Sequence, residues 1–111
     1  MRSLEEVIYK AKRIPHEETR RESEEYLEIV ANQETLKQLI PVLETYFGPA
    51  FKPAGKEPCD TCDEHTEPFG GIAKNQTLYL THKEDLPHVA MIWPWNDGRR
   101  ATVKISSHFP E

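Results

Sequence analysis

The chain has 111 residues, and its 14 Lys and Arg against 19 Asp and Glu give a net charge of −5 at neutral pH. This length predicts one small domain spanning residues 1–111, and the acidic balance argues against a nucleic-acid partner, which would select a basic surface. The chain has no apolar run near the roughly 20 residues that cross a bilayer, and it opens with charged residues where a signal peptide would be apolar. We therefore expect a cytoplasmic protein without a membrane partner.

The N-terminal quarter predicts a short helix followed by a charged linker. Ser3 begins a capping-box pattern, and the apolar residues that follow recur at helical spacing. Pro15 disfavours helical geometry in the residue before it, so we expect the helix to span residues 4–13. Residues 17–25 contain five Glu, two Arg and no apolar residue, which indicates an exposed linker or the exposed start of a second helix. Residues 1–25 are therefore expected to dock loosely.

The next segment predicts a strand and then the main helix. Residues 26–31 alternate in polarity and are rich in β-branched and aromatic types, which favours a strand, although a helix continuing from the Glu-rich run is the alternative. Asn32 then supplies a cap acceptor for a helix over residues 33–47, whose apolar residues form one stripe. Gly48 and the proline after it end this helix. Pro41 removes one backbone hydrogen bond inside it, so we expect a kink or a break there.

The rest of the chain predicts a long loop and two hairpins. Residues 48–71 are rich in Pro and Gly and contain both cysteines, which is typical of a loop. Residues 70–81 indicate one hairpin, and residues 88–95 and 100–106, joined through an Asp-Gly pair, indicate a second. Alternation in the last strand predicts one sheet face in water. The expected fold is α+β, with a mostly antiparallel sheet of four to five strands, including the strand at 26–31, and helices on one side.

Cys59, Cys62 and His65 form the first candidate site. Two thiolates at C-x-x-C spacing can hold one tetrahedral metal ion, and His65 would supply a third ligand, which predicts a zinc site. A lone C-x-x-C is less specific than the paired motif of many structural zinc sites, because the fourth ligand must come from elsewhere in the chain.

The same two cysteines also fit thiol–disulfide redox chemistry, which needs one thiol of lowered pKa. Residues 57–67 hold five carboxylates and no Lys or Arg. Negative charge disfavours a thiolate and attracts a divalent cation, so electrostatics favours metal binding over redox chemistry. The third alternative is a pair of reduced loop cysteines without a chemical role.

Trp93, Pro94 and Trp95 are the most distinctive run of residues. Strand geometry places the two tryptophans on one face, and Pro94 cannot donate to a sheet ladder, so this strand end is an edge or leaves the sheet. We expect Trp93 and Trp95, with Tyr79 as a third aromatic residue, to bind a planar or apolar ligand or another chain. The alternative is that the tryptophans cap a thin core.

The five histidines are accompanied by no nucleophile elbow, metalloprotease motif or phosphate loop. This argues against an enzyme and favours a small binding or regulatory module, a monomer or weak dimer, that recognises a protein or a small ligand through the aromatic sheet edge. The alternative function is that of a zinc-binding or thiol-redox protein that uses Cys59, Cys62 and His65.

Overall fold

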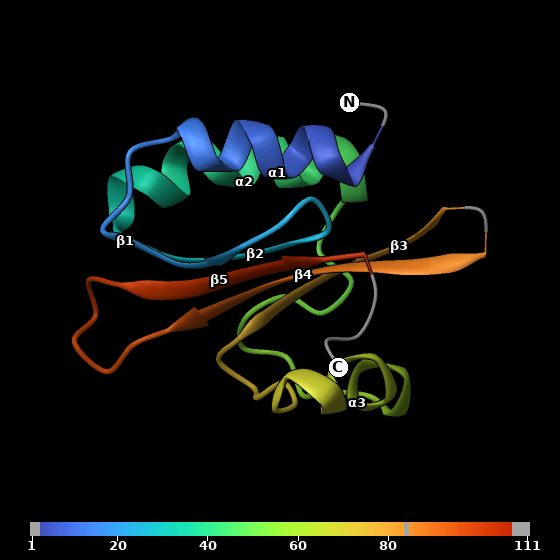
Figure 1. Cartoon of the computed structure of the whole chain (residues 1–111). Helices are drawn as coiled ribbons and strands as arrows, with labels where there is room; N and C mark the ends of the chain where they lie inside the picture. The colour runs from blue at the N-terminus through green and yellow to red at the C-terminus, as the bar shows by residue number, and fades with distance from the viewer. Residues whose placement is uncertain (1–2, 84, 108–111) are drawn as a thin grey trace.

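Figure 1 shows the computed structural model, which describes residues 3–83 and 85–107. Within these residues, three α-helices and a short 3₁₀ helix accompany a five-stranded sheet. In chain order the elements are α1 (Leu4–Arg13), β1 (Glu18–Glu22), β2 (Tyr26–Ala31), α2 (Gln33–Phe47), α3 (Asp60–Thr66), the 3₁₀ helix η1 (Glu67–Phe69), β3 (Thr77–Lys83), β4 (Leu86–Pro94) and β5 (Ala101–Ser106). The strands pair antiparallel in the order β1-β2-β5-β4-β3. The predicted α+β fold, with its antiparallel sheet, main helix and short N-terminal helix, is confirmed.

Helices α1 and α2 have the predicted bounds, because each begins at a capping residue. The Ser3 hydroxyl accepts a hydrogen bond from the Glu6 N–H (3.2 Å), and Asn32 Oδ1 accepts one from the Thr35 N–H (2.9 Å). Each bond satisfies a backbone donor that the first helical turn leaves without a helical partner. None of the described helices is both long enough and apolar enough to cross a membrane.

Pro41 does not break α2, which runs without interruption from Gln33 to Phe47, so the expected break is wrong. A proline removes the N–H that would bond to the carbonyl four residues earlier, here that of Lys37. Both Pro41 and Lys37 are exposed. Water can therefore bond to that carbonyl, which makes a proline on this face of the helix tolerable.

Residues 18–22 form the edge strand β1, so the predicted linker or exposed helix is wrong there. β1 pairs with β2 and contains a β-bulge between Thr19 and Arg21. All five of its side chains are exposed, so its sequence lacks the alternation that marks a strand with one buried face. Backbone hydrogen bonds to β2 hold the strand instead, and its charged side chains are typical of a sheet edge.

The sheet carries a helical layer on each face (Figure 1). α1 and α2 cover the face that presents Ala90, Ile92 and Val103, and the larger core cluster lies there. The opposite face, predicted to be in water, is covered by α3 and η1, so that expectation is wrong. The side chains that meet on this second face are those of Cys62, Phe69, Ile72, Leu78, Val89 and Met91. The segment that supplies the first three has too few apolar residues to show helical periodicity, which is why it resembled a loop.

Strand β3 pairs with β4, and the hairpin predicted between residues 70–73 and this strand is wrong. The turn between β3 and β4 contains Asp85, whose φ is positive at 67°. The outer edge of β3 is partly occupied by Lys52, which exchanges two backbone hydrogen bonds with Leu78 (3.1 and 2.9 Å). The hairpin of β4 and β5 turns at Asp97 and the following glycine, as predicted.

Candidate functional site

The two cysteines lie at the start of α3, on the second face of the sheet. Cys59 immediately precedes the helix, and its Sγ accepts a hydrogen bond from the Cys62 N–H (3.3 Å). The two sulfurs are 2.8 Å apart and share a hydrogen bond. The C-x-x-C spacing produces this contact, because the capping residue and the third residue of the first turn lie side by side.

The two thiols differ in their exposure to solvent. Cys59 is exposed, whereas Cys62 is only 1% exposed and packs in the cluster that contains Phe69 and Met91. The Thr66 hydroxyl donates to the Cys62 carbonyl (2.7 Å), one turn further along the helix. The burial of one cysteine therefore depends on the docking of α3 against the sheet.

The two thiols also differ in the direction of their pKa shifts. The pKa of Cys59 is lowered, first by the hydrogen bond from the Cys62 side chain and next by the Cys62 backbone N–H, because both donors favour the thiolate. The pKa of Cys62 is raised, first by burial and next by its hydrogen bond to Cys59. Cys59 is therefore the thiol that ionises first. These donors are in place only in the folded helix, so the neighbouring carboxylates alone predicted a disfavoured thiolate.

Within the described residues, the contacts of the His65 ring are with Thr61 and His82 and not with the two sulfurs. Its Nδ1 donates to the Thr61 carbonyl (2.9 Å), and its ring lies edge-on to that of His82, with centroids 5.8 Å apart. The described residues include no group of three or more His, Cys, Asp or Glu side chains arranged to hold a metal ion. A tetrahedral zinc ion with Zn–S bonds of about 2.3 Å would also hold two sulfurs about 3.8 Å apart. Zinc binding stays a prediction that would require Cys59 and Cys62 to separate.

Lys52 is a buried cation that the sequence analysis missed. It is 1% exposed, and its ammonium donates to the carbonyls of Ala73 (2.8 Å), Lys74 (2.7 Å) and Gln76. Burial lowers its pKa, while the charges of Cys62 and Glu57 act in the opposite direction. Its three N–H donors are thus matched to three acceptors, which fixes the turn that precedes β3. A single lysine in a Pro- and Gly-rich segment carries no signal of such a role.

The structure separates Tyr79 from the two tryptophans. Tyr79 is 3% exposed and lies in the core under α2, with its ring centroid 6.1 Å from that of Phe47. Trp93 lies on the opposite sheet face, where the Lys104 ammonium is 3.9 Å from its ring centroid. β3 and β4 pair no further than Thr77 with Ile92, so Trp93 extends past the end of β3. The predicted three-residue aromatic surface is therefore not assembled with Tyr79.

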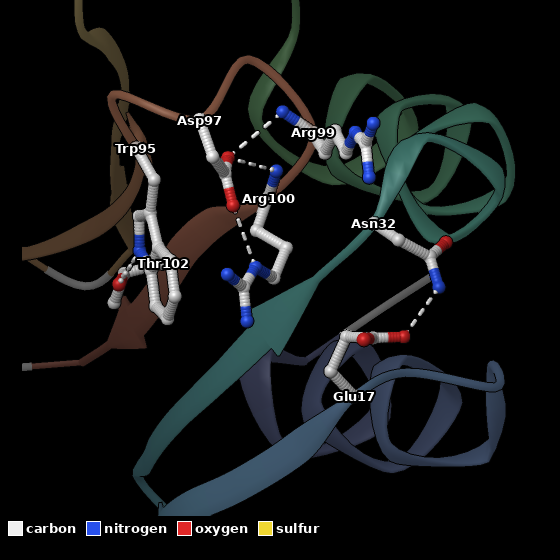
Figure 2. A network of polar contacts seen from close by, with 7 residues as sticks. All are labelled: Glu17, Asn32, Trp95, Asp97, Arg99, Arg100 and Thr102. Atoms are coloured by element: carbon white, nitrogen blue, oxygen red, sulfur yellow. Dashed lines mark hydrogen bonds and ion pairs between the residues drawn. The ribbon is translucent and has the colours of Figure 1, made fainter.

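Trp95 lies beside the β4–β5 turn, in the polar network of Figure 2. Its indole N–H donates to the Thr102 hydroxyl (2.9 Å), and the guanidinium of Arg100 lies 4.6 Å from its ring centroid. Arg100 also pairs with Asp97 (2.7 Å). The pKa of Asp97 is lowered to about 2, first by the hydrogen bond from the Arg99 backbone N–H and next by the Arg100 side chain. These contacts hold the β4–β5 turn in place next to Trp95.

A hollow of about 460 Å³ adjoins this turn. Its lining consists of Glu17, Asn32, Asp97, Arg99 and Arg100. Figure 2 shows the hydrogen bond that the Asn32 side-chain amide donates to the Glu17 carboxylate (2.8 Å). No contact to the Arg99 guanidinium is drawn there. Among the described residues, no ion pair or side-chain hydrogen bond of that guanidinium is found.

Comparison of the chain with protein-family models, with curated protein sequences and with solved structures gave no significant match.

Proposed function

We propose that the protein exchanges thiols with disulfides through Cys59 and Cys62. The observation that carries this proposal is the contact of two sulfurs 2.8 Å apart, one exposed and one buried. An exposed thiol of lowered pKa can attack a disulfide in solution, and a buried thiol next to it can attack only the bond that the first one forms. The arrangement thus separates an attacking cysteine from a resolving cysteine.

In the proposed reaction, the Cys59 thiolate attacks one sulfur of a substrate disulfide. A mixed disulfide forms, and the other substrate sulfur leaves as a thiolate that takes up a proton. Cys62 then loses its proton and attacks the Cys59 sulfur, which releases the second substrate thiol. The protein dithiol is oxidised to a disulfide by two electrons, and the substrate disulfide is reduced to two thiols.

The test uses the neutral compound bis(2-hydroxyethyl) disulfide and mass spectrometry of the intact chain. Since the chain has two cysteines, the reduced protein should lose two hydrogens when the internal disulfide forms. A Cys62→Ser variant should instead accumulate the mixed disulfide, and a Cys59→Ser variant should react much more slowly. If Cys59→Ser and Cys62→Ser react at equal rates, the proposed division of roles is wrong.

A His65→Ala variant is the matched control that separates redox chemistry from zinc binding. Thiol exchange does not use His65, so we expect its rate to be unchanged. Elemental analysis of protein purified without chelator provides the second measurement. One equivalent of zinc, bound by the wild type and lost in His65→Ala, would favour the zinc alternative over the redox function.

A second candidate function, ligand recognition near Trp95, is favoured by the Arg99 guanidinium, which lines the adjoining hollow and has no side-chain partner among the described residues. A guanidinium recognises a carboxylate by paired hydrogen bonds. Addition of acetate, the simplest carboxylate, should shift the NMR signals of Arg99 and of the Trp95 indole in the wild type. In an Arg99→Ala variant, the same titration should leave the Trp95 indole signal in place. Equal shifts across the whole spectrum would argue against a site.

A further inference from the structure

Carboxylates flank Cys59 closely in the sequence. The five acidic residues of this segment, all of them exposed, are Glu57, Asp60, Asp63, Glu64 and Glu67. A helix rises about 1.5 Å per residue, so the residues of α3 up to Glu64 lie within about 8 Å of Cys59 along the helix axis. This distance is about one Debye length at physiological ionic strength, so these charges act on a molecule that approaches the sulfur.

Few positive charges compensate for this acidic surface. Lys74 forms an ion pair with Glu57 at 3.5 Å. The Lys52 ammonium is buried and donates its hydrogen bonds to three backbone carbonyls. Lys56 is the one exposed cation between residues 53 and 67. Within the described part of the chain, no ion pair of the other four carboxylates is found. Lys104, whose ammonium donates to the Phe69 carbonyl (3.3 Å), is a further cation on this sheet face. Residues 57–67 contain five carboxylates and no Lys or Arg, so the segment around Cys59 still carries a net negative charge.

We propose that the disulfides reduced by Cys59 are flanked by positive charges, as in a basic polypeptide segment, and that anionic disulfides are poor substrates. This inference rests on the proposed thiol–disulfide function and specifies its substrate class. Like charges raise the free energy of the encounter between a thiolate and an anionic disulfide, and opposite charges lower it. The carboxylates of α3 thus select among substrates without touching the reacting sulfurs.

The experiment compares three small disulfides of similar size and different charge. The probes are cystamine (a dication), bis(2-hydroxyethyl) disulfide (neutral) and 3,3′-dithiodipropionate (a dianion), each at low ionic strength. Each rate is divided by the rate of the same probe with dithiothreitol, which corrects for the intrinsic reactivity of the disulfide. We expect the corrected rate for cystamine to exceed that for the dianion at least about fivefold, and the ratio to approach one near 1 M salt, where the Debye length is about 3 Å.

A pair of variants tests whether the carboxylates next to Cys59 cause the preference. Asp60→Asn combined with Glu64→Gln removes two charges from α3 and should lower the ratio of the cystamine rate to the dianion rate. The matched control, Glu5→Gln combined with Glu44→Gln, removes two exposed charges from α1 and α2 on the opposite sheet face. It should leave that ratio nearly unchanged, because the net charge of the chain changes equally in both variants.

The outcomes separate this inference from the function on which it rests. If the three probes react at equal corrected rates, or if both variant pairs change the ratio equally, the substrate preference is wrong while thiol exchange stands. If none of the probes forms the Cys59–Cys62 disulfide, the proposed function itself is wrong.

Discussion

The Lys52→Met variant tests whether the buried ammonium stabilises the segment next to β3. Methionine keeps the length and apolar character of the stem but offers no donors, so it leaves the carbonyls of Ala73, Lys74 and Gln76 without this partner. Hydrogen bonds to a charged group contribute about 1.5–3 kcal/mol each, and a buried acceptor that loses its donor costs about 1–3 kcal/mol. Since Ala73 and Lys74 are exposed, water can bond to some of the carbonyls that the ammonium leaves. We therefore expect a loss of about 2–3 kcal/mol in total, less than the sum for three lost bonds.

The measurement is urea denaturation followed by tryptophan fluorescence, with Lys56→Met as the matched control. Lys56 is exposed and has no ion pair among the described residues, so its variant should stay within about 0.5 kcal/mol of the wild type. Amide exchange should accelerate at Gly55 and Leu78, whose N–H groups bond within this segment, more than in β5. A loss below about 1 kcal/mol for Lys52→Met would show that water replaces the ammonium at little cost, and would refute the reasoning.

Three further results are expected. The pKa of Cys59 should rise in a Cys62→Ala variant, because the donor that most favours the thiolate is lost. The measurement is the pH dependence of Cys59 alkylation with iodoacetamide, and an unchanged pH profile would contradict this cause. The carboxyl carbon of Asp97 should titrate in NMR with a midpoint near pH 2, because the Arg99 N–H and the next arginine's side chain donate to it. The stability that this shift contributes is present above the ordinary carboxyl pKa and is lost as the pH falls towards 2, so a midpoint at about 4 would remove it. Trp93→Phe deletes a buried indole N–H that has no acceptor among the described residues. The free energy of unfolding should therefore change by less than about 1 kcal/mol. A loss of about 3 kcal/mol would show that the indole has a larger role in packing.

The parts of the fold that could be predicted are those that depend on neighbours in the sequence. Ser3 and Asn32 bond to N–H groups three residues away, so they mark helix starts without any knowledge of the tertiary structure. β1 could not be predicted, because strand alternation reports a buried face and Glu18–Glu22 bury none. The helix α3 was also missed, because its contact with the sheet uses few apolar side chains, Cys62 among them.

The candidate site shows the same division between local and long-range information. C-x-x-C spacing alone predicts that Cys59 and Cys62 meet. Their difference in exposure could not be predicted, because it arises only when α3 covers Leu78 and Met91 on a sheet face that the alternation of β5 assigned to water. The buried position of Lys52 could not be predicted for a related reason, since its acceptors lie more than twenty residues away in the chain.

The position of β5 has a consequence for how the chain assembles. β5 follows every other described strand in the sequence, yet it lies in the middle of the sheet between β2 and β4. Its partners in β2, from Tyr26 opposite Ser106 to Ala31 opposite Ala101, are 70 to 80 residues away. The β1–β2 and β3–β4 hairpins can form from local contacts, whereas the ladder that joins them must close a long loop first. During synthesis, β2 therefore has an unpaired inner edge until residues 101–106 emerge from the ribosome, and at that edge two incomplete chains can associate.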